Sequence, residues 1–166
     1  AKKFLIFIGG NDKYNNAKRI IQEFDNSVKN KHLILLSKNI NKRDIEITKN
    51  SLEILNFQRE ISEILNKVDA VICGGGLMKY DSGFSLLPCA SISQTKDQEI
   101  DSQVCDDKNI VYNFGLHNEI TNSSLRESII NFIDNSFQIK LKETLLNEYY
   151  YNSTQILAEE ILSFYK

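Results

Sequence analysis

The chain is poor in residues that break or punctuate regular structure. Its 166 residues include one proline, seven glycines, one methionine and no tryptophan. This composition excludes collagen-like and low-complexity chains. No stretch of about 18 apolar residues occurs, so we expect no membrane-spanning helix, and no signal peptide is visible. With 42% apolar and 25% charged residues, the sequence is typical of a globular protein with one domain over residues 1–166.

Cysteine is also scarce. Cys73, Cys89 and Cys105 are odd in number and lack the spacing of metal ligands. We expect them to be reduced and in or near the core, as is usual in cytoplasmic proteins. We expect no metal site and no cofactor. The chain opens on Ala1 directly before a strand-like run, which we interpret as processing or as part of a longer protein.

The net charge of −2 is unevenly distributed. Residues 1–50 hold eleven Lys and Arg against five Asp and Glu, whereas residues 51–166 hold nine against seventeen. A basic amino-terminal part could face phosphates, an acidic partner or an anionic membrane to which the protein binds peripherally. The stronger interpretation is a solvated face in a chain rich in Lys, Asn and Ile. We expect no nucleic-acid partner.

Short apolar runs alternate with helical patterns along the chain. We predict strands at 4–8, 32–36, 52–56, 69–73, 89–93 and 109–113, and the irregular segment 37–50 could hold a short strand around Ile45 and Ile47. Helices are predicted at 15–24, 59–67, 78–87, 98–107, 122–134, 138–148 and 154–165, the fifth capped by Asn122 or Ser123. This alternation predicts an α/β, Rossmann-like parallel sheet with helices on both faces, followed by a helical carboxyl-terminal extension from about residue 137.

Three polar or glycine-rich loops follow predicted strands: Gly9–Asp12, Gly74–Gly76 and Ser93–Gln98. In parallel sheets, ligands bind beyond the carboxyl ends of the strands. We therefore expect these loops to share one edge of the domain and to form a binding site there.

Glycine is the main signal for a ligand. Gly74, Gly75 and Gly76 join a buried strand to a helix, where glycines let a phosphate approach the backbone. The alternative is packing. Gly9, Gly10 and Asn11 form a turn that could also meet phosphates, although neither the dinucleotide fingerprint nor a Walker A motif is present, and it could equally be a plain turn.

Polar side chains supply the remaining candidates. Asp81 could accept hydrogen bonds from a ribose diol, or could simply favour the first turn of its helix. Asp97 and Gln98 suit sugar hydroxyls, although Asp97 could be a helix cap. His32 opens a strand and is expected to be structural. His117, in a loop on the same edge, could contact a ligand.

These motifs, in this order, resemble the carboxyl-terminal, nucleotide-sugar-binding domain of GT-B glycosyltransferases of family 28. The resemblance covers residues 4–135 and rests on Gly-Gly-x-Asp at 9–12, Gly-Gly-Gly-x-x-x-Tyr-Asp at 74–81, and Leu-Pro-Cys-Ala-Ser-Ile-Ser-x-x-x-Asp-Gln at 87–98. In style the chain is most similar to the UDP-sugar hydrolase of the pseudaminic acid pathway and its spore-coat polysaccharide relatives. The peptidoglycan GlcNAc transferase and the small subunit of a eukaryotic dolichol-linked GlcNAc transferase share the domain.

The resemblance implies a role for each motif. Gly9 and Gly10 would face the interdomain cleft, and Gly75 and Gly76 would meet the diphosphate. Asp81 would hold the ribose. The pair Asp97 and Gln98 would contact the donor sugar or a phosphate, and the segment from Asn56 to Ile61 would frame the uracil.

The sequence also departs from the family. Asn11 stands where Ser or Thr is usual, and Asp81 is shorter than the usual Glu. The helix start at 77–79 is bulky, so Lys79 could meet a phosphate or block the site. A complete GT-B enzyme has two such domains, and the family's hydrolase keeps its catalytic base in the other one. We therefore expect these 166 residues to be inactive alone.

The function predicted from the sequence is a UDP-sugar-binding donor domain of a glycosyltransferase or nucleotide-sugar hydrolase. Its acceptor half would be a missing domain or a separate subunit, and its catalytic residues are unknown. One alternative is a non-catalytic module that binds a protein partner through an apolar patch beside the glycine loop. Another is a complete α/β enzyme with His117 as general base.

Overall fold

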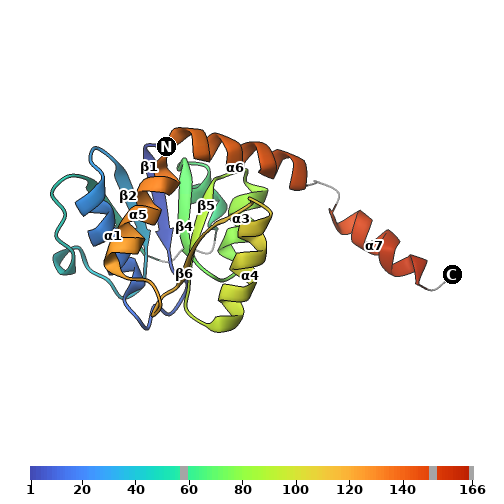
Figure 1. The fold of residues 1–166 in the computed structure, drawn as a ribbon, viewed down its shortest axis with the longest axis horizontal. Helices are drawn as coiled ribbons and strands as arrows, with labels where there is room; N and C mark the ends of the chain where they lie inside the picture. The colour runs from blue at the N-terminus through green and yellow to red at the C-terminus, as the bar shows by residue number, and fades with distance from the viewer. Residues whose placement is uncertain (57–59, 150–152, 165–166) are drawn as a thin grey trace.

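A six-stranded parallel sheet forms the centre of the chain in the computed structural model, which describes residues 1–56, 60–149 and 153–164 (Figure 1). The strand order is β3-β2-β1-β4-β5-β6. The strands are β1 Lys3–Phe7, β2 His32–Leu36, β3 Ser51–Leu55, β4 Ala70–Gly74, β5 Cys89–Ser93 and β6 Tyr112–Leu116. The order reverses direction beside β1, which pairs with both β2 and β4. This reversal is the usual ligand-binding point of such sheets.

Helices cover both faces of the sheet, as predicted. The helices in the described residues are α1 Asn16–Ser27, α2 Ser62–Leu65, α3 Met78–Phe84, α4 Lys96–Asp107, α5 Asn122–Ile133, α6 Asn135–Glu148 and α7 Ser153–Ser163. Because side chains alternate along a strand, Phe4 and Ile6 of β1 pack with α1 and α5, whereas Leu5 belongs to the cluster of α2, α3 and α4. The continuous apolar run of β1 is therefore explained by burial on both sides.

The three cysteines are free and buried, as predicted. Cys73 and Cys89 lie on the neighbouring strands β4 and β5, with their sulfur atoms 3.5 Å apart. The hydrogen-bond contact with Cys89, together with burial, raises the pKa of the Cys73 thiol, which favours the unreactive protonated form.

Two predicted boundaries were wrong for the same reason. The last strand begins at Tyr112 rather than at Asn109, because Asn109 adopts φ 55° and closes the end of α4. Similarly, α3 ends at Phe84 rather than at Leu87, because Leu86 adopts φ 55° and the amide of Leu87 bonds back to the carbonyl of Ser82. Left-handed residues of this kind end helices.

The segment 37–50 contains no strand around Ile45 and Ile47. It forms a short 3₁₀ helix, η1 (Lys42–Asp44), followed by a loop. The buried carboxylate of Asp25 on α1 holds this loop, because it accepts hydrogen bonds from the amides of Thr48 and Lys49 and from the side chain of Asn50.

The last two helices differ in their packing. Leu141 and Leu145 of α6 are buried against the body of the protein, whereas α7 stands away from it in Figure 1. In α7, apolar side chains including Leu157 and Leu162 are exposed. No helix in the described part of the chain combines the length and apolarity needed to cross a membrane.

Candidate functional site

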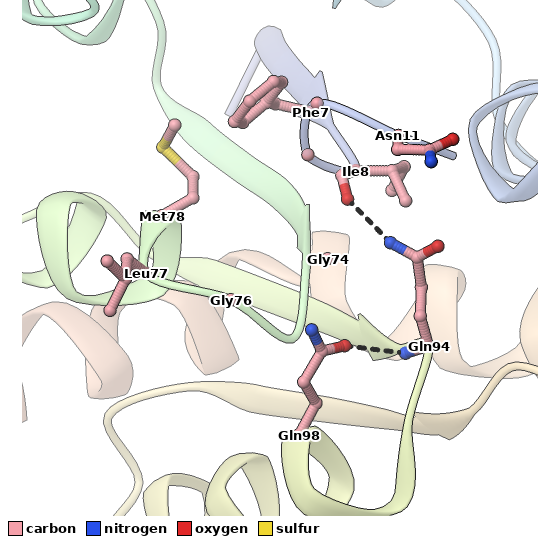
Figure 2. A pocket seen from close by; sticks show the side chains of 11 residues that line it. Phe7, Ile8, Asn11, Gly74, Gly76, Leu77, Met78, Gln94 and Gln98 are labelled. Atoms are coloured by element: carbon pink, nitrogen blue, oxygen red, sulfur yellow. Dashed lines mark hydrogen bonds between the residues drawn. The ribbon is translucent and has the colours of Figure 1, made fainter. Parts of the chain in front are cut away.

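A pocket of about 220 Å³ opens at the carboxyl ends of β1, β4 and β5, where the sequence predicts a site (Figure 2). It brings together most of the predicted glycines with three side-chain amides, those of Asn11 after β1 and of Gln94 and Gln98 after β5. The residues lining it are Phe7, Ile8, Gly9, Gly10, Asn11, Gly74, Gly76, Leu77, Met78, Gln94 and Gln98. Six of the ten predicted site residues are among them: Gly9, Gly10, Asn11, Gly74, Gly76 and Gln98.

A second hollow of about 90 Å³ adjoins this pocket. It shares Phe7, Gly9 and Gly10 with the first pocket and extends toward the loop after β2 at residues 37–40. The Gly9–Gly10 turn thus lines both hollows, so a ligand longer than a phosphate group could occupy both of them.

Two of the three consecutive glycines are explained by packing. A side chain at Gly74 would collide with the carbonyl of Ile8, the residue directly after β1. At Gly75, a Cβ atom would lie 2.7 Å from Cβ of Gln98 and 2.8 Å from Oγ of Ser93. Both distances are below van der Waals contact, so β1, β5 and α4 require glycine at these positions whether or not a ligand binds.

Packing within the protein does not require glycine at positions 76 and 10. A Cβ atom at either position would meet nothing within 4 Å, and neither residue has the positive φ that favours glycine. Gly9, by contrast, has φ +108°. Gly76 and Gly10 come from different loops, are exposed, and line the same pocket. The absence of a side chain at both positions keeps the pocket open from two sides.

Two glutamines fix the floor between the loops. The side-chain amide of Gln94 donates to the carbonyl of Ile8 at 3.1 Å, which joins the end of β5 to the end of β1. Oε1 of Gln98 accepts from the backbone amide of Gln94 at 2.9 Å (Figure 2). Within the described residues, Nε2 of Gln98 makes no hydrogen bond, which leaves one amide donor for a ligand.

Lys79 neither meets the pocket nor blocks it. Its side chain is 1% exposed, and its ammonium donates to the carbonyls of Gly75 at 2.6 Å and Gly76 at 3.3 Å. The third partner is the carboxylate of Asp101 on α4, at 2.7 Å. The hydroxyl of Tyr80 donates to the same carboxylate. Lys79 therefore lies beneath the glycine loop, with every proton of its ammonium paired.

The two predicted aspartates lie outside the pocket lining. Asp81 is exposed on the first turn of α3, and its carboxylate makes no hydrogen bond within the described residues. Asp97 is exposed on the first turn of α4. Asp97 is not the helix cap, because the side chain of Thr95 caps α4 by accepting from the amide of Gln98. Thr121, rather than Asn122 or Ser123, caps α5.

The amino end of α1 is already occupied by a side chain of the protein. The carboxylate of Asp12 accepts from the amides of Asn16 at 2.9 Å and Ala17 at 2.8 Å. The first two amides of α1 are therefore already paired and are not available to an anion.

The histidines are placed apart from the pocket lining. His117 stacks on Tyr14, with ring centroids 3.8 Å apart and planes 20° apart. His32 contacts the hydroxyl of Ser51 at 2.7 Å and the carboxylate of Glu53 at 3.4 Å, in agreement with a structural role. In the described part of the chain, no three metal-ligating side chains gather.

Five lining residues were missing from the prediction: Phe7, Ile8, Leu77, Met78 and Gln94. Gln94 immediately follows Ser93, the last residue of β5, as the glycines follow their own strands. This shared position was available in the sequence and could have identified Gln94. The predicted uracil loop at 56–61 falls largely on residues 57–59, which lie outside the described residues.

No family model and no curated protein matches the sequence. Among solved structures, MurG of Acinetobacter baumannii superposes with a TM-score of 0.70 and 13% identity over 98% of this chain and 50% of that one. The glycotransferase of kitacinnamycin superposes with a TM-score of 0.67 and 17% identity over 88% of this chain and 37% of that one. The spinosyn rhamnosyltransferase SpnG, solved with thymidine diphosphate, superposes with a TM-score of 0.66 and 13% identity over 89% of this chain and 42% of that one.

The chain has the fold of the carboxyl-terminal half of GT-B glycosyltransferases. It spans at most half the length of these three structures. Identities of 13 to 17% relate the folds alone. What binds in the pocket therefore has to be argued from its own residues.

Proposed function

We propose that the pocket binds the diphosphate of a nucleotide-sugar, and that the chain is the donor half of a glycosyltransferase or nucleotide-sugar hydrolase. The observation that carries the proposal is the pairing of Gly10 with Gly76. Neither glycine is needed by the protein's own packing or backbone, and both line one pocket. A ligand that must closely approach the backbone of both loops would explain why glycine stands at both positions.

The chemistry of the lining suits a phosphate ester. The pocket presents backbone from two glycine loops and side-chain amides from Asn11, Gln94 and Gln98. Backbone amides in such loops form concave anion sites. Negative charge grows on a nucleoside diphosphate as the sugar–phosphate bond breaks, and fixed N–H donors stabilise that charge without rearranging.

The size of the pocket supports a partial site. Pockets for drug-sized ligands measure roughly 300–1,000 Å³, whereas this pocket measures about 220 Å³. It accommodates a diphosphate more readily than a whole nucleotide-sugar. The ribose would reach Asp81 on α3, and the sugar would extend toward Asp97 and Gln98 at the start of α4.

A second half would complete the enzyme. The chain matches at most half the length of the similar glycosyltransferases, and the described residues present no activated base at the pocket. The acceptor and the catalytic base would come from another domain or subunit. In this arrangement the present chain binds and orients the donor but does not turn it over alone.

A titration of the purified chain tests this proposal. UDP and UDP-GlcNAc should raise the melting temperature and give saturable heats in calorimetry, whereas CMP, with one phosphate, should bind much more weakly. Thymidine diphosphate, the ligand solved with SpnG, serves to test the base. Equal binding of both diphosphates would mean that this chain recognises the phosphates rather than the base. A folded chain that responds to no diphosphate would contradict the proposal.

A second candidate is a non-catalytic module that binds a protein partner. One observation favours it: Leu77, Tyr80 and Phe84 are 78%, 37% and 53% exposed, and their spacing places them along one side of α3. This apolar stripe begins at the pocket, where the module hypothesis predicts a patch. Phe84→Ser changes the stripe outside the pocket lining and separates the candidates. This substitution should leave UDP binding intact if the pocket is the functional site.

A further inference from the structure

The buried ammonium of Lys79 contacts two consecutive carbonyls of the glycine loop, those of Gly75 and Gly76. A trans peptide group is planar, and its N–H points opposite to its C=O. The carbonyl of Gly75 shares a peptide group with the amide of Gly76, and the carbonyl of Gly76 shares one with the amide of Leu77. Holding both carbonyls toward Lys79 therefore turns both amides away from it.

These two amides differ from the one before them. The amide of Gly75 donates to the carbonyl of Ile92 at 3.1 Å, which fastens the loop to β5. Within the described residues, the amides of Gly76 and Leu77 donate to nothing. Gly76 and Leu77 line the pocket, whereas Gly75 is buried behind it. The two adjacent unpaired amides of Gly76 and Leu77 thus lie on the pocket side of the loop, and Lys79 holds the loop from its buried side.

We infer that Lys79 is the positioning residue that orients the amides of Gly76 and Leu77 toward a bound phosphate. The inference rests on the proposed function, since it names how that site holds its anion. Lys79 does not touch the ligand, because its ammonium is already shared among Gly75, Gly76 and Asp101. It also polarises the two peptide groups, and polarised hydrogen-bond chains strengthen their outer donors.

Asp101 and Tyr80 keep Lys79 in this position. The carboxylate of Asp101 lies 2.7 Å from the ammonium and accepts the Tyr80 hydroxyl at 2.8 Å. The ammonium also lies 5.1 Å from the centre of the Tyr80 ring, within the range of a cation–π contact. The positive charge is therefore fixed by two helices, α3 and α4, rather than by a flexible side chain alone.

Amide NMR of the wild-type chain tests the orientation directly, with pyrophosphate as the probe. Saturating pyrophosphate should shift the Gly76 and Leu77 amide resonances, while the Gly75 amide, bonded to Ile92, should move little. If pyrophosphate binds and these two resonances do not move, the inference is overturned. This measurement needs no substitution and so does not depend on a variant that folds.

The role of Lys79 is tested by Lys79→Met, with Lys108→Met as the matched control at the exposed end of α4. We expect Lys79→Met to weaken the binding of UDP and pyrophosphate by about tenfold while leaving unchanged any affinity for uridine, which carries no phosphate. A merely structural role would weaken uridine equally. A folded Lys79→Met chain with wild-type affinity for pyrophosphate overturns the inference.

The two proposals fail differently. A wild-type chain that binds UDP without shifts at Gly76 and Leu77 overturns the Lys79 inference and leaves the proposed function standing. A chain that binds pyrophosphate through these amides but binds neither UDP nor thymidine diphosphate overturns the proposed function and supports the inference. Binding of neither ligand overturns both.

Discussion

Gly83 on α3 lies directly against the ring of Tyr149 at the end of α6, with no room for a side chain between them. Tyr149 is partly buried, and this burial raises the pKa of its hydroxyl to about 12. The contact joins the carboxyl-terminal helical region to the helix that follows the glycine loop. The packing of α6 is therefore coupled to the helix on which Lys79 and Asp81 stand.

Gly83→Ala should destabilise the protein, because its methyl group would overlap the Tyr149 ring. Overpacking of this kind typically lowers the free energy of unfolding by about 1–3 kcal/mol. Urea denaturation of the variant measures the change. Combining it with Tyr149→Ala should recover part of the loss, and additive effects of the two substitutions would contradict the proposed overlap.

Gly76→Ala, unlike Gly83→Ala, should leave stability nearly unchanged and weaken ligand binding. A Cβ atom at Gly76 meets nothing within 4 Å, so the free energy of unfolding should stay within about 0.5 kcal/mol of wild type. Its methyl group would face the pocket, and we expect UDP affinity to fall about tenfold. Calorimetry of Gly76→Ala and Gly10→Ala checks this. Unchanged affinity in both would remove the main support for the proposed function.

Asp81→Ala should separate ribose recognition from phosphate recognition. Its exposed carboxylate makes no hydrogen bond in the described part of the chain, so stability should be unaffected. Hydrogen bonds to charged groups contribute about 1.5–3 kcal/mol. Wild type should therefore prefer UDP over 2′,3′-dideoxy-UDP by roughly tenfold or more, and Asp81→Ala should lose this preference. Wild-type discrimination in the variant would contradict a ribose role.

Most strands and the site's location could be predicted because they depend on local patterns. Apolar runs such as Phe4–Ile8 identified the strands, and each loop on the ligand edge followed one of them. The start of β6 could not be predicted, because Ile110 and Val111 are as apolar as a strand. Their place in a helix-ending turn depends on the left-handed conformation of Asn109.

The position of Lys79 depended on tertiary contacts. In the sequence, a lysine three residues after a glycine loop favours a direct phosphate contact. Its burial follows from Asp101, which lies 22 positions later in the chain and meets it only when α4 packs beside α3. Likewise, the three glycines at 74–76 look equivalent in sequence, and only their neighbours separate the two packing glycines from the open one.

Asp101 should make stability depend on pH in the acid range. The hydrogen bond from Lys79, with help from Tyr80, lowers the pKa of this carboxyl in the folded protein. Its contribution is therefore present above the unfolded pKa of about 3.9 and is lost as pH falls through the lower folded value. The gap in melting temperature between wild type and Asp101→Asn should narrow from pH 6 to pH 3. Asp97→Asn, at an exposed position on the same helix, is the control. If its difference in melting temperature from wild type narrows in the same way, the effect comes from general acid unfolding and not from Asp101.

Arg19 should be irreplaceable by lysine, because its three donors join α1 to the loop after β6 and to the first residue of α5. Its Nε atom bonds to Asn122 at 2.7 Å, and its two terminal nitrogens bond to the carbonyls of His117 at 2.9 Å and Ile120 at 2.5 Å. Lysine has a single nitrogen and cannot reproduce this fork.

Arg19→Lys should therefore leave at least one partly buried carbonyl unpaired and lower the free energy of unfolding by about 1–3 kcal/mol. Arg43→Lys, at an exposed position in η1, should change it little. Loss of the Arg19 hydrogen bonds should also disturb the stacking of His117 on Tyr14, because Arg19 holds the backbone that carries the imidazole. Ring-proton shifts of His117 report this. Unaltered shifts together with a wild-type denaturation midpoint would mean that the loop is held by Thr121 and its capping contacts alone.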